Sequence, residues 1–222
     1  MLNKDLHRKI MYDILQDIFN SELWKYLAFK GGTACYFLYQ LDRFSTDLDF
    51  DLVKDFENID LEIIKILKKY GQVKKWKYNL KLSYWDNDVN IKIDISRNIW
   101  KNNNYEIKNF YWTDILTQDK STIFSNKLVA LLERNANRDI YDVYFFFKNN
   151  FSLNNDLIFE RTWKTRKEVF KEIIKKLESL WENYKILDWL WEVLSWEKQK
   201  QFVKTKLLKE LIWILKFKVD FE

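Results

Sequence analysis

The sequence predicts an α+β protein, with a mixed β-sheet and helices in residues 1–118 followed by an all-helical part in residues 119–222. Alternating segments in the first half, of which DLDFDL at 47–52 is the clearest, have the two-residue period of β-strands. From Ser121 onward, apolar residues recur at the three- and four-residue spacing of helices instead. No repeat or low-complexity linker separates the two patterns, so we expect two domains that meet near residue 118.

In the first half, helices and strands are expected in alternation. Apolar residues at helical spacing predict a helix over residues 5–23, and we expect His7 on its exposed surface. A short apolar run at 26–30 predicts a strand that stops at Gly31 and Gly32, after which Thr33 caps a helix over 34–41. Further along we expect a strand over 47–52, a helix over 58–70, a β-hairpin formed by 73–84 and 89–96 with WDND as its turn, and a strand near 107–111.

The second half is expected to be helical throughout. Its periodic segments lie at 121–134, at 137–148, at 156–180 with a break near Thr162, and at two further places between residues 186 and 217. Aromatic residues make up 18% of the chain, and at helical spacing such residues favour a packed core over stacking platforms for nucleic acid.

Composition excludes several classes of protein. With 47% hydrophobic and 32% charged residues and no uncharged apolar run long enough to span a bilayer, disorder and a transmembrane protein are excluded. The first residues do not have the form of a signal peptide, so we expect a soluble, cytoplasmic protein. One cysteine and one histidine exclude an internal disulfide, a cysteine or histidine metal site and the usual triads. Carboxylates and metal ions must therefore carry any catalysis, and the net charge of +5 permits a polyanionic partner.

Two features of the first half suit phosphate chemistry. Gly31, Gly32 and Thr33 form a turn at a helix N-terminus, where free backbone N–H groups can bind a phosphate, although the same residues also suit a simple turn and cap. Asp47 and Asp49 share one strand face about 6.6 Å apart, given a rise of about 3.3 Å per residue. Such carboxylates suit a divalent cation such as Mg²⁺. A solvated face of an edge strand remains the alternative, and Asp51 in the same row favours it.

Asp94, in the segment NIKIDIS, is the third candidate carboxylate. If its strand lies beside the DLDFDL strand, Asp94 points into the same site, where it can bind a metal ion or take a proton from an attacking hydroxyl. Thirteen residues separate Thr33 from Asp47, which is enough for a short helix and a return loop. The helix N-terminus and the acidic strand are therefore expected at one edge of the sheet.

The segment KGGTACYFLYQLDRFSTDLDFDL resembles the first motif of the nucleotidyltransferase AbiEii/AbiGii toxin family. That motif is a Gly-Gly-Ser/Thr turn, a helix, and then Arg, Ser and Asp-x-Asp, here Arg43, Ser45, Asp47 and Asp49. A second block, SNKLVALLERNANRDIYDVYFF, is similar to the family's helical motifs. It supplies Lys127, Arg134, Arg138, Asp139 and Asp142.

The resemblance implies a polymerase-beta-like nucleotidyltransferase domain followed by a helical domain that completes the active site. It implies transfer of a nucleoside monophosphate from an NTP, with two Mg²⁺ ions held by Asp47, Asp49 and Asp94. The turn at residues 31–33, together with Ser45, would bind the nucleotide. Lys127 and Arg134 would neutralise the charge of the triphosphate or the acceptor, and Arg138, Asp139 and Asp142 would orient them or complete the catalytic site. The alternative for the second block is a set of solvated cations paired with neighbouring carboxylates.

Three functions remain open at this point. The first is a toxin of a toxin–antitoxin or phage-defence module that modifies tRNA or another RNA, paired with an antitoxin encoded nearby. The second transfers the nucleotide to a protein hydroxyl. The third is a non-catalytic nucleotide-binding module, which the retained set of three aspartates disfavours.

The chain has 3 glycines, no proline and 11 tryptophans. Average usage would give roughly 15 glycines in a chain of this length, which is close to the sum of the glycines and tryptophans. Several tryptophans stand where turns are expected, namely Trp76, Trp85, Trp112, Trp189, Trp191 and Trp196. We therefore predict that many of these codons are UGA, read as glycine in the natural host.

Overall fold

The computed structural model describes residues 2–77, 79–84, 89–180, 185–188, 190–194 and 196–221. They form two compact units, which we describe separately. The first unit comprises Met1–Gln40, Phe44–Ile99 and Tyr105–Asp119, and the second comprises Leu41–Arg43, Trp100–Asn104 and Lys120–Glu222. None of the helices in these described ranges is long and apolar enough to cross a membrane.

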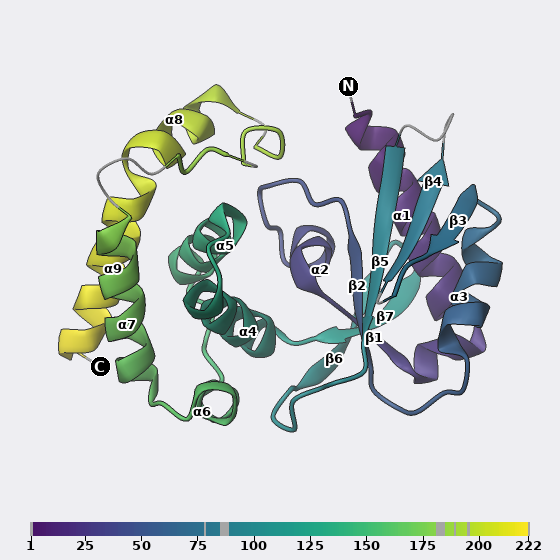
Figure 1. Ribbon diagram of the computed structural model, residues 1–222, viewed down its shortest axis with the longest axis horizontal. Helices are drawn as coiled ribbons and strands as arrows, with labels where there is room; N and C mark the ends of the chain where they lie inside the picture. Colours follow the sequence, from purple (N-terminus) through teal and green to yellow (C-terminus); the bar gives the residue numbers. More distant parts are fainter. Residues whose placement is uncertain are drawn as a thin grey trace. The chain divides into compact units, whose positions relative to one another are not determined.

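A seven-stranded mixed sheet is the centre of the first unit (Figure 1). Its strands are β1 (Leu27–Lys30), β2 (Leu48–Leu52), β3 (Gln72–Lys75), β4 (Asn79–Tyr84), β5 (Val89–Ser96), β6 (Tyr105–Phe110) and β7 (Thr113–Gln118). They lie in the order β3-β4-β5-β2-β1-β7-β6. β2 is parallel to β5 and antiparallel to β1, so the acidic strand is central and both its neighbours contribute to the surroundings of its carboxylates.

Helices cover both faces of this sheet. They are α1 (Lys4–Phe19), the short 3₁₀ helix η1 (Glu22–Lys25), α2 (Gly31–Leu38) and α3 (Ile59–Leu67). Figure 1 shows α2 and α3 on opposite faces, and α1 packs against α3 and β7. The alternation of β2 explains this arrangement, because Leu48 and Phe50 are fully buried on one face while Asp47 and Asp49 are on the other.

The second unit is helical. It contains α4 (Lys120–Glu133), α5 (Asn137–Lys148), α6 (Asn155–Thr162), α7 (Arg166–Ser179), α8 (Glu197–Thr205) and α9 (Leu207–Phe221). α7 packs along α9, and α4 along α5 (Figure 1). Phe124, Phe146 and Phe170 are among its fully buried side chains. The interruption expected near Thr162 separates α6 from α7, and a capping box of Thr165 and Glu168 starts α7.

The predicted fold class is confirmed, with four local corrections. The 107–111 segment is only the first strand of a hairpin, because β7 follows it directly. Residues 73–84 form two strands, and the WDND turn lies outside the described residues. Thr33 does not cap α2, whose N-cap is Lys30 without a side-chain bond. His7 is buried, at 1% exposure, instead of lying on the surface.

Tryptophan occupies exposed positions throughout the described residues. The eight tryptophans in this part of the chain are between 42% and 95% exposed, whereas this large side chain is highly buried on average. Trp112 and Trp163 have φ angles of 69° and 56°, in the left-handed region that glycine adopts most readily. Both observations support the prediction that glycine stands at many of these positions in the natural protein. Trp85 and Trp189 lie outside the described residues.

Candidate active site

Gly31 brings the first turn of α2 against the carboxylate of Asp49. A Cβ atom on residue 31 would lie 2.3 Å from Oδ2 of Asp49, so the Asp49 carboxylate would have to move to make room for it. The φ angle of Gly31 is +79°, which L-residues other than glycine rarely adopt. Only glycine therefore satisfies both constraints at this position. The backbone N–H groups that open α2 and the carboxylate of Asp49 consequently belong to one site.

Thr33 connects α2 to the segment before β2. Its Oγ1 donates a hydrogen bond to the backbone carbonyl of Asp47, and the Thr33 residue is fully buried. The hydroxyl that we expected to cap the helix instead fixes the backbone at the first aspartate of the motif. Ser45, two residues earlier, is also buried, at 6% exposure.

Asp49 and Asp94 lie side by side on the adjacent strands β2 and β5. In the parallel register of β2 and β5, Asp49 lies opposite Asp94, and on its other side Asp49 lies opposite Lys30 of β1. Asp47 lies one residue before β2. The proximity that we predicted from two separate sequence segments is therefore present for Asp49 and Asp94.

The charges of these aspartates act on Lys92. Its ammonium lies 3.0 Å from Oδ2 of Asp94. Burial is the largest single influence on the pKa of Lys92 and lowers it, but the hydrogen bond and the charge of Asp94, together with the other aspartates, outweigh burial, and the net shift of this pKa is upward. The charges of Asp49 and Asp47 contribute further to this upward shift. The charges of all three predicted carboxylates therefore act on the ammonium of Lys92.

Asp51, the third aspartate of the β2 row, has a different role. It is 1% exposed and accepts hydrogen bonds from Lys30 at 2.7 Å, Tyr105 at 2.9 Å and Gln118 at 2.6 Å. This carboxylate is thus fully engaged in holding Lys30 and the neighbouring strands. The alternative of a solvated edge strand is wrong, because β2 is central and Asp51 is buried.

A network of ion pairs in the helical unit joins Arg43 of the first predicted motif to four residues of the second predicted block. Arg43 bonds Asp142 through Nε at 2.6 Å and through Nη2 at 2.7 Å, and both side chains are at most 2% exposed. Lys127 Nζ lies 2.9 Å from Asp139 Oδ1 and 2.9 Å from Asp142 Oδ2. Arg134 completes the network with a 2.7 Å bond from Nε to Asp139. Its three cations and two carboxylates leave a surplus positive charge, which suits a phosphate-bearing ligand.

These groups keep their charges over a wide pH range. Burial alone would raise the pKa of Asp139, but the combined effect of Lys127 and Arg134 is larger and lowers this pKa to about 2. Burial also opposes ionisation of Asp142, but the charges of Arg43 and Lys127 lower its pKa overall. Burial lowers the pKa of Lys127, while the charges of Asp142 and Asp139 raise it well above its usual range. Asp139 is accordingly suited to holding cations in place rather than to accepting a proton.

The alternative of solvated helix cations paired with carboxylates is met in part by Lys127, which pairs with Asp139 and Asp142 but is only 15% exposed. It describes Arg134 and Arg138 better, because both residues are exposed. Sequence reasoning missed Lys30, Lys92 and His7. Lys92 shares the Asp94 face in NIKIDIS, so its alternation with that aspartate was the available signal.

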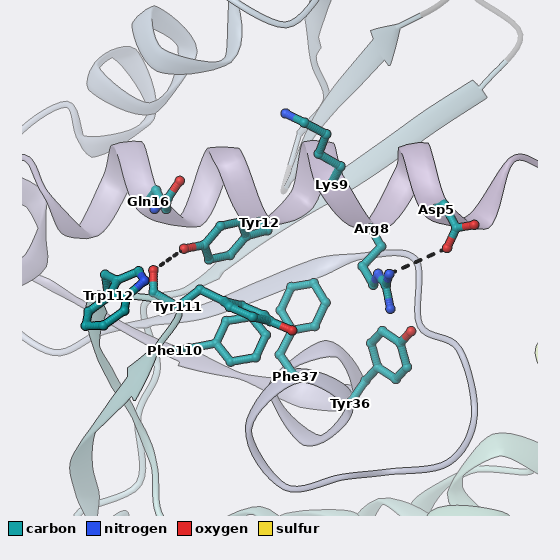
Figure 2. Close-up of a pocket in the computed structure, with 10 residues that line it drawn as sticks. All are labelled: Asp5, Arg8, Lys9, Tyr12, Gln16, Tyr36, Phe37, Phe110, Tyr111 and Trp112. Atoms are coloured by element: carbon teal, nitrogen blue, oxygen red, sulfur yellow. Dashed lines mark hydrogen bonds and ion pairs between the residues drawn. The ribbon is translucent and has the colours of Figure 1, made fainter.

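A separate groove of about 690 Å³ lies on the first unit (Figure 2). Its lining consists of Asp5, Arg8, Lys9, Tyr12, Gln16, Tyr36, Phe37, Phe110, Tyr111 and Trp112. Figure 2 shows Tyr12 donating to the backbone oxygen of Tyr111, and Arg8 paired with Asp5. None of the predicted site residues lines this groove.

Comparison with known proteins identifies the family of this chain. A family model for the nucleotidyl transferase AbiEii toxin of type IV toxin–antitoxin systems matches residues 13–192. The solved structure of JHP933 from Helicobacter pylori is 21% identical, with a TM-score of 0.62 over 99% of this chain and 94% of that one. MenT4, a nucleotidyltransferase toxin from Mycobacterium tuberculosis, is 15% identical, with a TM-score of 0.66 over 96% of this chain and 84% of that one. A comparison with curated proteins gave no significant match.

The two structural likenesses establish a shared fold, and the family model covers most of the sequence, including both motifs. This chain belongs to the AbiEii family of nucleotidyltransferase toxins of type IV toxin–antitoxin systems.

Proposed function

We propose that this protein transfers a nucleoside monophosphate from an NTP to a hydroxyl group of an RNA acceptor such as tRNA. The observation that carries the proposal is the contact between Gly31 and Asp49, which joins a helix N-terminus to a pair of neighbouring carboxylates. Phosphate oxygens suit the N–H groups of that turn, and carboxylates suit the cations that accompany an NTP. Within a family of nucleotidyltransferase toxins, this combination favours nucleotide transfer over nucleotide sensing.

The donor set suits divalent cations. Asp47, Asp49 and Asp94 offer oxygen ligands, which Mg²⁺ prefers, and their charges already act on the ammonium of Lys92. Among the described residues, no three His, Cys, Asp or Glu side chains are arranged to hold a metal ion together. The neighbouring pair Asp49 and Asp94, with Asp47 beside them, would hold two Mg²⁺ ions, which supply charge neutralisation for the triphosphate.

The residues of this chain have defined tasks in the proposed reaction. The N–H groups at Gly31, Gly32 and Thr33 bind the β- and γ-phosphates, and the carboxylate of Asp94 accepts the proton of the acceptor hydroxyl. The hydroxyl oxygen bonds to the α-phosphorus, the bond from that phosphorus to the bridging oxygen of the β-phosphate breaks, and pyrophosphate leaves. Lys127, Arg134 and Arg138 would neutralise phosphate charge, and Asp139 would hold Lys127 for that task.

Partners follow from the same proposal. A cognate antitoxin encoded beside the gene would restrain the toxin, and the module would act in the cytoplasm, in phage defence or in another toxin–antitoxin role. The family membership supports an antitoxin partner, and the net charge of +5 suits an RNA acceptor.

Incubation with each α-labelled NTP, Mg²⁺ and total tRNA tests the proposal. We expect label in RNA with at least one nucleotide, and no label with Asp49→Asn. The matched control Asp55→Asn, at an exposed aspartate after the same strand, should retain activity. Label that stays with polypeptide after RNase treatment would favour transfer to a protein hydroxyl. NTP binding without transfer to either acceptor would favour a non-catalytic module.

A further inference from the structure

His7, the single histidine of the chain, is buried on the packed face of α1. It is 1% exposed and shares that face with Met11, Ile14 and Leu15, which have no exposed surface. A buried imidazole is costly unless both ring nitrogens find hydrogen-bond partners. His7 meets this requirement through two residues that are far from it in the sequence.

The two partners define the tautomer of His7. Its Nε2 lies 3.0 Å from the backbone oxygen of Thr46, and its Nδ1 contacts the hydroxyl of Tyr84. Because a carbonyl oxygen only accepts, Nε2 must carry the proton, and Nδ1 then accepts from the Tyr84 hydroxyl. Burial lowers the pKa of His7 and raises the pKa of Tyr84 to about 12, so a neutral imidazole and a protonated phenol agree with this assignment.

The Thr46 carbonyl belongs to the segment that delivers the first carboxylate of the candidate site. Residues 44–47 lie outside the β-ladder, so strand pairing does not fix them. Two successive carbonyls of this segment are instead held by side chains from different helices. His7 of α1 donates to Thr46, and Thr33 of α2 donates to Asp47.

We propose that His7 is a positioning residue that holds the Thr46 carbonyl and thereby aims the carboxylate of Asp47 at the cation site. The inference rests on the proposed function, because only the proposed function gives Asp47 a cation to bind. His7 itself touches no substrate and takes no part in proton transfer. Residues that orient metal ligands commonly change metal affinity or activity by 10–100-fold when they are replaced, although they bind nothing themselves.

Two substitutions of similar polarity separate this role from general packing. In His7→Gln the amide nitrogen reaches the position of Nε2 and can still donate to Thr46. In His7→Asn the shorter side chain ends near the position of Nδ1 and cannot. Tyr84→Phe is the matched control, since it removes the other hydrogen bond of the imidazole and leaves the donation to Thr46 in place.

Binding of Mn²⁺, measured by electron paramagnetic resonance with a non-hydrolysable NTP analogue present, gives a readout that does not depend on turnover. We expect His7→Asn to weaken Mn²⁺ binding and lower kcat by about 10–100-fold, with KM for the NTP changed by less than about threefold. His7→Gln and Tyr84→Phe should stay within about threefold of the wild type in both measurements. Thermal unfolding of each variant reports the purely structural cost.

The inference is overturned if folded His7→Asn binds Mn²⁺ and turns over like the wild type, or if His7→Gln fails to restore what His7→Asn loses. If His7→Asn does not fold, the other two variants decide. The inference is then overturned if His7→Gln and Tyr84→Phe lose Mn²⁺ binding to the same extent, because the donation to Thr46 is kept in both. A wild type that binds Mn²⁺ but transfers no nucleotide defeats the proposed function, while the Mn²⁺ series still decides the role of His7. A wild type that binds no Mn²⁺ defeats both.

Discussion

Replacing Trp112 by glycine is expected to stabilise the protein. Trp112 lies in the turn between β6 and β7 with φ 69°, directly after Tyr111 with φ 43°. Two successive positive φ angles define the tight hairpin turn in which Asn-Gly is preferred, because glycine has no Cβ to clash there. The Trp112 side chain is 95% exposed, so its removal sacrifices almost no buried surface.

The expected gain is the difference between two opposing effects. An L-residue in the left-handed region costs about 1–2 kcal/mol, which glycine relieves. Glycine also gives the unfolded chain more freedom, which costs about 0.5–1 kcal/mol. Trp112→Gly should therefore raise the free energy of unfolding by about 0.5–1 kcal/mol. Trp112→Ala keeps the Cβ atom, and hence the strain, so we expect it to gain nothing.

Urea unfolding followed by circular dichroism measures this difference. With a slope of about 2 kcal/mol/M, the midpoint should rise by about 0.3–0.5 M for the glycine variant at unchanged slope. A glycine variant no more stable than the alanine variant would refute the reasoning. The same reasoning extends to the natural gene and protein. A UGA codon at position 112, and natural protein lighter by the difference between tryptophan and glycine at each such site, are the expected results.

Three further predictions concern the candidate site and its supporting network. Gly31→Ala should abolish nucleotide transfer, because a Cβ would meet the Asp49 carboxylate at 2.3 Å. It should also cost about 1–3 kcal/mol of stability, because φ at this residue is +79°. The transfer assay measures the first effect and urea unfolding the second. Asp142→Asn should cost about 3–5 kcal/mol, since it leaves the buried Arg43 charge without its carboxylate; urea unfolding of the variant measures this loss. The pKa of Asp139, about 2, lies below its unfolded value, so this carboxylate stabilises the fold above about pH 4. That contribution, about 2 kcal/mol, should disappear as pH falls toward 2, as seen in urea midpoints measured across this range.

Each of these predictions has a result that contradicts it. Full activity of Gly31→Ala would separate the α2 turn from the reaction. An Asp142→Asn variant as stable as the wild type would show that Arg43 finds other partners on release. For Asp139, the control is Asp139→Asn, whose stability should fall less between pH 5 and pH 2.5 than that of the wild type. Equal acid sensitivity of the two proteins would show that this carboxylate does not carry the effect.

Much of the fold was predictable because local patterns agree with it. The alternation of DLDFDL predicts a strand with one apolar and one acidic face, and β2 has both. The hairpin β6–β7 was incomplete in the prediction because Tyr111 and Trp112 do not resemble turn residues. If glycine stands at residue 112 in the natural protein, that missing turn signal is restored.

The sequence predicted which residues form the candidate site, but not which other residues they contact. Asp49 and Asp94 were paired as a conditional expectation, and only the parallel register of β2 and β5 makes them neighbours. The prediction placed His7 on the exposed surface of the first helix, whereas the structure buries it on the packed face of α1. Its packed face includes Met11 and Ile14, so His7 belongs to the same stripe at i−4 and i−7.

By itself, the sequence determined most of the elements, the polar and apolar faces of the acidic strand and the two motifs that identify the family. These properties depend on residues close together along the chain, where a period of two or of 3.6 decides which side chains share a face. The tertiary structure alone decided that Asp51 is a buried anchor, that Lys92 pairs with Asp94, and that His7 donates to the carbonyl of Thr46. Those contacts join residues that are far apart in the chain, and their energies depend on burial and strand register, which local sequence does not encode.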